Sequence, residues 1–330
     1  MVTRKLIALL LLAAACGKGK AGAPEAQAQA QPVAEIGTVN ALPAETRVII
    51  GVQVPRIVVS PLARRLLAEL LGRDPEAQQR LVDLLGRCKI DPARDVREVT
   101  IAMAEGQDLA LIVRGTLDAP ALLGCVRTEA TAGGGSFSEK PLAGQTIYAA
   151  TSQAGTQKVW LAFAGSGTVV AALSEGWLAK VLDPSTPRID SRPDTVSLLR
   201  KVGRDAAVWG VGYLPPGAGA QLVKLTERQV VAPALSVGFE ASFDKGLDAA
   251  LRMDMASSSD ADHLATFAKG QLDWIAVAAQ QYRLGQLVAR AQLTTDGPSV
   301  KLSIKLDDAD VKKVEAALAD NPAVKKEQSK

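Results

Sequence analysis

The stretch "VGFEASFDKGLDAALRMDM" at residues 237–255 decides the fold class. Apolar side chains occupy alternate positions on either side of Asp244-Lys245-Gly246. A period of two gives a strand one apolar face and one polar face, as in antiparallel sheets that cover a core on one side. Gly246 can adopt the positive φ that a short hairpin connection requires. The stretch therefore predicts an antiparallel β-hairpin with one buried face.

The same alternation recurs elsewhere along the chain, at residues 96–115, 145–173 and 287–306. Apolar residues at a spacing of three to four predict helices between the strands, for example over residues 61–71 and 260–282. This mixture predicts an α+β fold, in which helices pack on one face of an extended antiparallel β-sheet.

The order of elements repeats within the chain. Residues 43–182 and residues 194–320 both read β-α-ββ-α-ββ-α. A polar stretch with three prolines at residues 183–193 separates them and predicts a joint. Residues 321–330 predict a disordered tail. The two halves share no clear residue identity, so the repeat lies in the order of elements.

The N-terminus has the layout of a secretory signal peptide over residues 1–15. Arg4 and Lys5 precede an apolar run at residues 6–12, and three alanines follow. A membrane-spanning helix needs ~20 apolar residues, so this run is too short to be one. The sequence therefore predicts export from the cytoplasm.

The ending Ala-Ala-Ala-Cys at residues 13–16 resembles the lipobox of bacterial lipoproteins. In that family the peptide is cut before the cysteine, whose sulfur carries a diacylglycerol and whose amine is usually acylated. The resemblance implies that Cys16 is lipidated and anchors the protein to a membrane. Gly17 stands where some lipoproteins retained in the inner membrane carry Asp, which favours the outer membrane. The alternative is an ordinary secreted protein, cut at its alanines, in which Cys16 is a chance thiol.

Residues 16–42 predict a disordered tether after the lipidated cysteine. They are rich in Ala, Gln, Pro and Gly and contain few large apolar side chains, so they cannot bury enough surface to fold. Such a segment reaches about 25–30 Å on average. The phrase "LPAET" at residues 42–46 then runs into a strand. This opening behind a lipobox resembles a broad set of uncharacterised bacterial envelope lipoproteins, and the resemblance implies no known activity.

Cys88 and Cys125 are the two other cysteines of the chain. An even number of cysteines in an exported protein predicts a disulfide between them. The alternative is a pair of buried free thiols, because cysteine often behaves as a small apolar residue. Neither has a neighbouring cysteine at CxxC spacing, so neither a redox motif nor a zinc site is predicted.

Three local patterns resemble catalytic or metal-binding motifs and are better explained by structure. Asp260, Asp262 and His263 could ligate a metal, but their spacing suits the capped start of a helix. Ser242 and Lys245 match Ser-x-x-Lys, yet they lie where a strand enters a turn, and the partner motifs of that enzyme class are missing. "LDDAD" at residues 306–310 predicts another helix start. No catalytic, cofactor-binding or metal-binding residue is therefore predicted, and no cofactor.

Charge and aromatic content argue against nucleic acid as a partner. Removal of Arg4 and Lys5 with the signal peptide leaves 36 of the 38 basic side chains against 35 acidic ones. A nearly neutral protein has no global field that attracts a polyanion. The chain has only 4 Trp, 3 Tyr and 5 Phe, and each Trp has mostly apolar neighbours, so we expect them in the core.

The sequence leaves three classes of function open. The first, which the sequence favours, is a non-enzymatic envelope lipoprotein that acts as a binding, scaffold or accessory module for an unknown envelope partner. The second is a carrier of an apolar ligand in a cavity between sheet and helices. The third is a hydrolase with a carboxylate site that leaves no local motif. The small side chains that could leave room for an apolar ligand are Ala149, Ala150, Ala162, Ala164, Ala171 and Ala172.

Overall fold

A computed structural model describes residues 39–319, apart from residues 73, 105–107, 154, 156–157, 166 and 215–233. The signal peptide, Cys16, the tether up to residue 38 and the tail at 321–330 lie outside the described residues. The chain divides into two compact units, residues 1–59 with 64–197 and residues 60–63 with 198–330.

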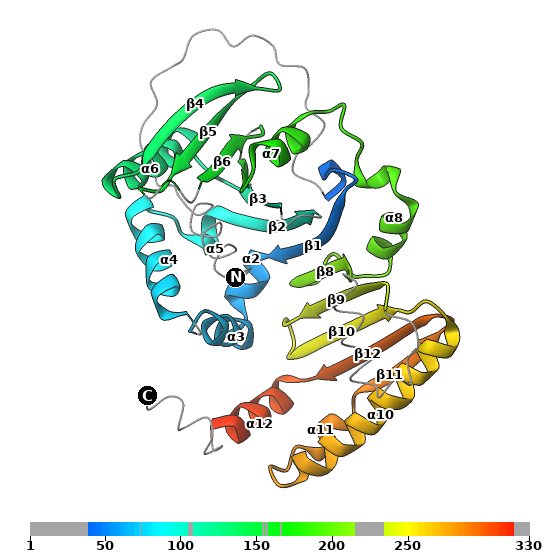
Figure 1. Cartoon of the computed structure of the whole chain (residues 1–330). Coiled ribbons are helices and arrows are strands. Elements are labelled where there is room, and N and C mark those ends of the chain that lie inside the picture. The colour runs from blue at the N-terminus through cyan, green and yellow to red at the C-terminus, as the bar shows by residue number, and fades with distance from the viewer. Residues whose placement is uncertain are drawn as a thin grey trace. The chain divides into compact units, whose positions relative to one another are not determined.

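The sheet of the first unit contains seven antiparallel strands (Figure 1). In spatial order they are β1 (Thr46–Gln53), β2 (Val96–Ala104), β3 (Leu109–Gly115), β7 (Thr168–Ala172), β6 (Lys158–Phe163), β5 (Gln145–Thr151) and β4 (Ser136–Leu142). The helices of this part of the chain are α2 (Val54–Val59), α3 (Pro61–Gly72), α4 (Pro75–Cys88), α5 (Pro92–Asp95), α6 (Ala119–Ala132), α7 (Glu175–Leu182) and α8 (Pro193–Arg200). Short 3-10 turns lie at Val39–Ala41 and Ile189–Ser191.

Helices cover both faces of this first sheet. Leu122 and Val126 of α6 share a buried cluster with Leu111 and other residues of one face. Ile112 and Val170 point to the opposite face, because side chains alternate along a strand, and they are equally buried. The buried side of α7 contacts β3, β6 and β7 and covers that second face. The predicted α+β class, with helices on an extended antiparallel sheet, is confirmed. In this unit helices lie on a second face as well, because β3, β6 and β7 are apolar at successive positions.

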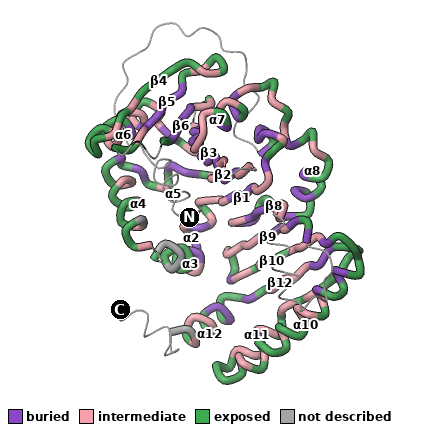
Figure 2. Tube along the Cα trace, viewed as in Figure 1, coloured by how far each residue is buried: buried purple, intermediate pink, exposed green. Residues whose placement is uncertain are grey.

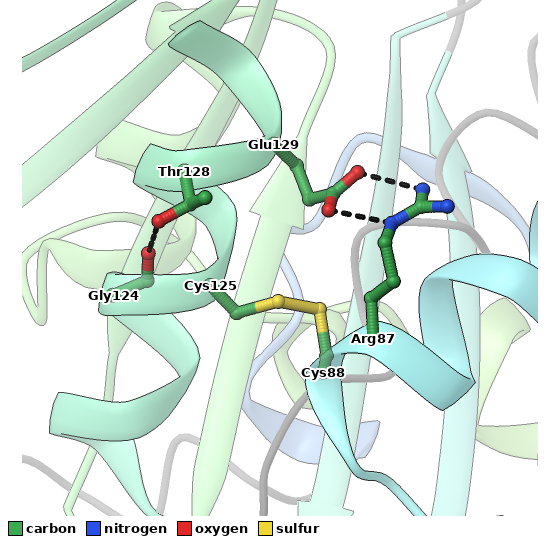
Figure 3. Close-up of a disulfide and its surroundings, with 6 residues drawn as sticks. All are labelled: Arg87, Cys88, Gly124, Cys125, Thr128 and Glu129. Carbon is green, nitrogen blue, oxygen red and sulfur yellow. Dashed lines mark hydrogen bonds and ion pairs between the residues drawn. A yellow bond between two sulfur atoms is a disulfide. The ribbon is translucent and has the colours of Figure 1, made fainter. Parts of the chain in front are cut away.

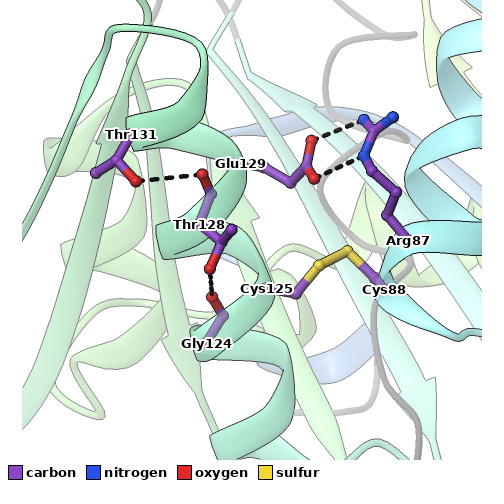
Figure 4. Close-up of polar contacts among 7 residues, drawn as sticks. All are labelled: Arg87, Cys88, Gly124, Cys125, Thr128, Glu129 and Thr131. Atoms are coloured by element: carbon purple, nitrogen blue, oxygen red, sulfur yellow. Dashed lines mark hydrogen bonds and ion pairs between the residues drawn. A yellow bond between two sulfur atoms is a disulfide. The ribbon is translucent and has the colours of Figure 1, made fainter.

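A disulfide links α4 to α6 (Figure 3). The Cα atoms of Cys88 and Cys125 are 5.6 Å apart, within the usual range for such bridges. The expected pairing is thus present in the structure. One turn along α6, Glu129 accepts two hydrogen bonds from the Arg87 guanidinium, at 2.6 and 2.7 Å (Figure 4). The bidentate contact raises the pKa of Arg87 and adds a second tie between the two helices.

The second unit has a five-stranded antiparallel sheet. Its spatial order is β8 (Val208–Tyr213), β9 (Ser236–Ser242), β10 (Leu247–Asp254), β12 (Ser299–Leu306) and β11 (Gln292–Asp296). Its described helices after β8 are α10 (Ser258–Gln280), α11 (Gly285–Val288) and α12 (Asp308–Ala319). The hairpin β9–β10 is the one predicted first, and it turns at Gly246. Gly246 has φ +100°, and a Cβ there would lie 2.1 Å from the Leu306 carbonyl oxygen, so only glycine fits.

The two units share a strand order. The order β1-β2-β3-β7-β6 in the first unit corresponds to β8-β9-β10-β12-β11 in the second, with β5 and β4 added at the far edge of the first. In both, the helix after the central hairpin leads to a strand pair whose last strand lies beside that hairpin. The repeat predicted from the sequence therefore holds in topology. The predicted β-α-ββ-α-ββ-α order places the first helix of the second half at residues 218–231, which lie outside the described residues.

Two segments differ from the sequence prediction. Strand β4 begins directly after the three glycines at residues 133–135 and was not among the strands predicted from the sequence, because its mostly exposed side chains give no apolar alternation. The expected joint at residues 183–193 is packed into the first unit. Arg188 donates hydrogen bonds to the carbonyls of Val181 and Asp183, and Ile189 is 1% exposed. The division between the units falls instead after Ser197.

The disulfide should stabilise the first unit measurably. Replacing both Cys88 and Cys125 by serine frees a loop of 37 positions in the unfolded chain. The chain-entropy model gives a loss of about 3–4 kcal/mol in the free energy of unfolding. Urea unfolding of the oxidised protein, the reduced protein and the double variant measures it, and the last two should agree. Glu129→Gln is the control, since breaking an exposed ion pair costs about 1 kcal/mol or less. A loss no larger than that of the control would contradict the prediction.

Candidate functional site

The residues that resembled metal-binding motifs in the sequence lie at the starts of two helices. Ser257 caps α10 by accepting a hydrogen bond from the Asp260 backbone N–H at 3.1 Å, and its hydroxyl donates to the Asp260 carboxylate at 2.7 Å. His263 and Asp262 are exposed beside this cap. Asp307 caps α12 by accepting from the Asp310 backbone N–H at 2.8 Å. Both helix starts were predicted from the sequence.

The Ser-x-x-Lys match also has a structural position. Ser242 is the last residue of β9, and Lys245 follows in the turn before β10. Over the described ranges, no three His, Cys, Asp or Glu side chains gather closely enough to hold a metal ion. The same ranges contain no helix that is both long and apolar enough to cross a bilayer.

The second unit contains an apolar cavity of about 610 Å³ between its sheet and its helices. The floor is the apolar face of β9, β10 and β12, and the walls and roof come from α10, α11 and α12. Glu240 and Ser303 are the only polar residues among those lining it. The apolar lining consists of Phe239, Ala241, Ala249, Ala250, Leu251, Leu272, Ile275, Ala279, Leu284, Leu287, Val288, Ala291, Leu302, Ile304, Leu306 and Val314.

The cavity exists because small side chains face one another across the sheet and helix. Ala249 of β10 pairs with Ala241 of β9, and Ala279 of α10 lines the same space. Leu251 on the central strand β10 remains 37% exposed, and Ile275 of α10 42% exposed. A central strand of a helix-covered sheet ordinarily buries such a side chain. The apolar face here is therefore only partly covered.

Two small buried clusters define where α10 packs. At the start of the helix, Ala261 and Leu264 pack with Met255 and Val300. Near the other end of the sheet, Leu287 of α11 packs with Leu306 and with Val311 of α12. Between these clusters α10 is half-buried or exposed, as Figure 2 shows. The helix is thus held firmly at its start, and its second half covers a space that it does not fill.

The second half of α10 also exposes apolar side chains to the outside. Trp274 is 69% exposed and Val277 66% exposed. The expectation of core packing holds for Trp160, Trp177 and Trp209, which are buried, and is wrong for Trp274. The cause is the helical period, because Leu272, Ile275 and Ala279 place one face of α10 over the cavity and Trp274 and Val277 fall on the opposite side.

A second cavity, of about 520 Å³, lies on the other side of α10, toward α11 and the edge strand β11. Leu272, Val288 and Ala291 line both cavities. Unlike the first, this one has four polar or charged residues in its wall, namely Thr266, Lys269, Asp273 and Thr295. The first cavity is therefore almost wholly apolar, and the second has a mixed wall in which the four polar or charged residues accompany seven apolar ones.

A polar ladder on β9, β10 and β12 fixes the register of the cavity floor. The Asp254 carboxylate accepts hydrogen bonds from Ser236 and Lys201, each at 3.0 Å, and from the Ser299 hydroxyl. Burial opposes ionisation of this carboxyl, but the three donors together hold the pKa of Asp254 below its ordinary value of 3.8. Ser236 and Ser299 are the cross-strand partners of Asp254, so the contact joins all three strands.

The first unit has a polar cavity of about 360 Å³ at one end of β1, β2 and β3. Arg97, Glu98 and Arg114 line it. Arg114 and Glu98 lie 3.3 Å apart and neutralise each other, which leaves Arg97 as the remaining charged residue of this wall. The alanines expected to leave room for an apolar ligand lie elsewhere in this unit. Of these alanines, Ala149, Ala150, Ala162, Ala171 and Ala172 are buried and the sixth, Ala164, is half-buried.

That expectation therefore pointed to the wrong half of the chain. In the first unit Ala150 and Ala171 belong to the buried cluster that includes Leu122 and Val126 of α6. On the other face α7, with Trp177 and Leu178 buried, contacts β3, β6 and β7, so in the described part of this unit neither face leaves an apolar space over the alanines. In the second unit α10, the counterpart of α6 in chain order, brings Ala276 and Ala279 toward the sheet. A run of alanines on the strand, together with alanines on the covering helix, is the sequence signal that would have found the cavity.

Comparisons with known proteins give little further information. No family model matches the chain, and no curated protein matches it. Among solved structures, "Structure of crystal form I of TP0453" matches with a TM-score of 0.47 and 9% sequence identity, over 88% of this chain and 99% of that chain. Agreement at this level carries no inference about fold or function.

Removal of the Asp254 charge should destabilise the cavity floor in a pH-dependent way. Asp254→Asn leaves buried donors without an ionised acceptor, which costs about 1–3 kcal/mol at pH 7. Because the pKa of Asp254 is lowered in the folded state, its stabilisation is present above about pH 4 and is lost as the pH falls through the folded value. Urea unfolding at pH 7 and pH 3 should show a difference between variant and wild type that shrinks in acid.

The exposed Asp248 on the same strand provides the control for this prediction. It pairs only with Lys305, at 3.0 Å, and both side chains are largely exposed. Asp248→Asn should change the free energy of unfolding by less than about 1 kcal/mol. An Asp254→Asn effect of equal size at both pH values would show that the charge of Asp254 is not what stabilises the ladder.

Proposed function

We propose that this protein is a lipid-anchored lipoprotein of the bacterial cell envelope, located in the outer membrane, that acts as a binding module and not as a catalyst. Its site is the apolar cavity of the second unit, and its ligand carries a hydrocarbon chain. The single observation that supports this function most strongly is the 610 Å³ space lined by sixteen apolar residues and two polar ones. This joins the first two functions that the sequence left open, since the binding module and the carrier share one site.

Size and chemistry both support a hydrocarbon ligand. Ligand pockets are commonly about 300–1,000 Å³ and are mostly apolar, with a few polar groups that fix orientation. Each methylene that leaves water for an apolar site contributes about 0.8 kcal/mol. A chain inserted between Leu251 and Ile275 would also cover side chains that are now 37% and 42% exposed. Ligand and protein would thus both remove apolar surface from water.

The wall chemistry favours binding over hydrolysis. In each of the three cavities described above, a single acidic residue lines the wall, namely Glu98, Asp273 or Glu240. Glycosidase-type hydrolysis by carboxylates needs two acids on either side of the bond that breaks. The geometry of these cavities offers no such pair. This supports a non-enzymatic role for the sites that the structure describes.

The anchor follows from the resemblance of residues 13–16 to a lipobox, and Cys16 lies outside the described residues. Its lipid would hold the body about 25–30 Å from a bilayer through the tether. A bilayer is also a source of amphiphiles with hydrocarbon chains. A lipid anchor would therefore hold the proposed binding site close to a source of its proposed ligand.

Filling the cavity should block binding of a neutral hydrocarbon ligand. Ala249→Phe in the floor combined with Ala279→Phe in the roof occupies space that several methylenes would use. We expect the affinity for a monoacylglycerol with a 16-carbon chain to fall roughly tenfold or more, because each methylene contributes about 0.8 kcal/mol and 1.4 kcal/mol is tenfold. Isothermal titration calorimetry with the soluble mature body, cut free of its anchor, measures the affinity.

Ala278→Phe is the matched control for the roof. Ala278 is the neighbour of Ala279 on α10 and lines neither cavity. The same substitution there should leave the affinity within roughly twofold of wild type. If the wild-type protein does not bind the monoacylglycerol, or if the double variant binds as well as wild type, the apolar cavity is not a hydrocarbon site and this proposal is wrong.

Cys16→Ser should release the protein from the membrane. A serine cannot accept the thioether-linked diacylglycerol, and a signal peptide without its lipobox cysteine does not yield the anchored form. Fractionation of host cells should move the protein from the envelope membranes to the soluble or uncut fraction. Mass spectrometry of the wild type should show acyl chains on an N-terminal Cys16. An unmodified N-terminus at another residue would contradict the anchor and leave the cavity proposal standing.

A further inference from the structure

The polar cavity beside α10 has the wall of a head-group site. Lys269 and Asp273 lie one helical turn apart on α10 and both line it, and Thr266 of the same helix and Thr295 of β11 add hydroxyl groups. Lys269 forms no ion pair with any residue that the structure describes, and neither does Asp273. Side chains at this spacing have Cβ atoms about 5–6 Å apart. One wall therefore presents a free cation and a free anion to the same space.

This polar cavity adjoins the apolar one. Leu272 lies between Lys269 and Asp273 in the sequence. Leu272, Val288 and Ala291 line both cavities. An elongated ligand under α10 would therefore meet apolar groups at one end and charged groups at the other. That is the chemistry of an amphiphile whose hydrocarbon chain fills the 610 Å³ cavity and whose head group fills the 520 Å³ cavity.

We propose that the ligand is a zwitterionic phospholipid-type amphiphile, whose phosphate binds Lys269 and whose primary ammonium binds Asp273. This inference rests on the hydrocarbon site proposed above. A purely anionic head group would gain Lys269 but would be repelled by Asp273, and a neutral one would leave both charges unused. A head group with both signs matches the wall, and the Thr295 hydroxyl can donate a hydrogen bond to a phosphate oxygen, whereas the Thr266 hydroxyl donates to the Asp262 carbonyl at 2.9 Å.

The order of Lys269 and Asp273 along α10 explains why the two side chains remain open to a ligand. A lysine placed four residues before an acid forms a weaker helix pair than the reverse order. Some other basic side chains of the second unit are paired, namely Lys201 with Asp254 and Lys305 with Asp248. Lys269 and Asp273 instead point along the wall of a cavity, where a ligand can bridge them.

The test compares three single-chain lipids with the same 16-carbon acyl chain. They are lysophosphatidylethanolamine, which is zwitterionic, lysophosphatidic acid, which is anionic, and monoacylglycerol, which is neutral. We expect the wild-type protein to bind the zwitterionic lipid most tightly. Lys269→Gln should lower the affinity for both phosphate-bearing lipids by roughly three- to fivefold, the size of an exposed ion pair, and leave the neutral lipid unchanged.

Asp273→Asn gives the outcome that distinguishes a head-group site from a general effect of charge. It should lower the affinity for the zwitterionic lipid and raise the affinity for the anionic lipid, so that the anionic lipid becomes the tighter ligand. Lys312→Gln on α12, an exposed lysine that lines neither cavity, is the matched control and should change no affinity.

The outcomes separate this inference from the proposed function. Equal binding of all three lipids by the wild type, with no effect of Lys269→Gln or Asp273→Asn, would overturn the head-group assignment and leave the hydrocarbon site intact. Binding of the neutral lipid by both variants shows that they are folded and that the apolar cavity is unchanged. Failure of the wild type to bind any of the three would overturn both proposals.

Discussion

The central constraint in this protein is the apolar face of β9, β10 and β12, which must be covered by helices but is not filled by them. A sheet with one apolar face is stable only when another layer removes that face from water. Here the cover is α10, which packs tightly at Ala261 and Leu264 and then runs above small side chains. The apolar cavity and the second space beside α10 both follow from that mismatch between helix and sheet.

The first unit has the same topology, but over its described residues the helices leave no apolar cavity above the sheet. Its helix α6 occupies the position of α10 in chain order, but it has 14 residues against 23. The Cys88–Cys125 disulfide and the Arg87–Glu129 contact hold α6 against α4, and Leu122 and Val126 close the core beneath it. On the other face α7, with Trp177 buried, contacts β3, β6 and β7. One copy of the topology is therefore closed and cross-linked, and the other leaves room for a ligand.

Strands, turns and helix starts could be predicted from the sequence, because each depends on neighbours along the chain. The alternation in β10, the glycine at position 246 and the cap at Ser257 are local signals of this kind. Strand β4 was missed because an exposed edge strand needs no apolar alternation. The cavity was placed in the wrong half for a different reason: alanines in a strand become either core or cavity wall according to the helix that lies above them, and no local pattern contains that information.

The residues of the proposed head-group site could not be identified from the sequence either. Lys269 and Asp273 look like an ordinary solvated pair on a helix, and only the neighbouring cavity gives them a role. The two charges are exposed, so each contributes modestly, on the scale of about 1 kcal/mol. The hydrocarbon chain must supply most of the affinity, at about 0.8 kcal/mol for each buried methylene. Selectivity between lipids would therefore be set by the polar side of α10, and retention of any of them by its apolar side.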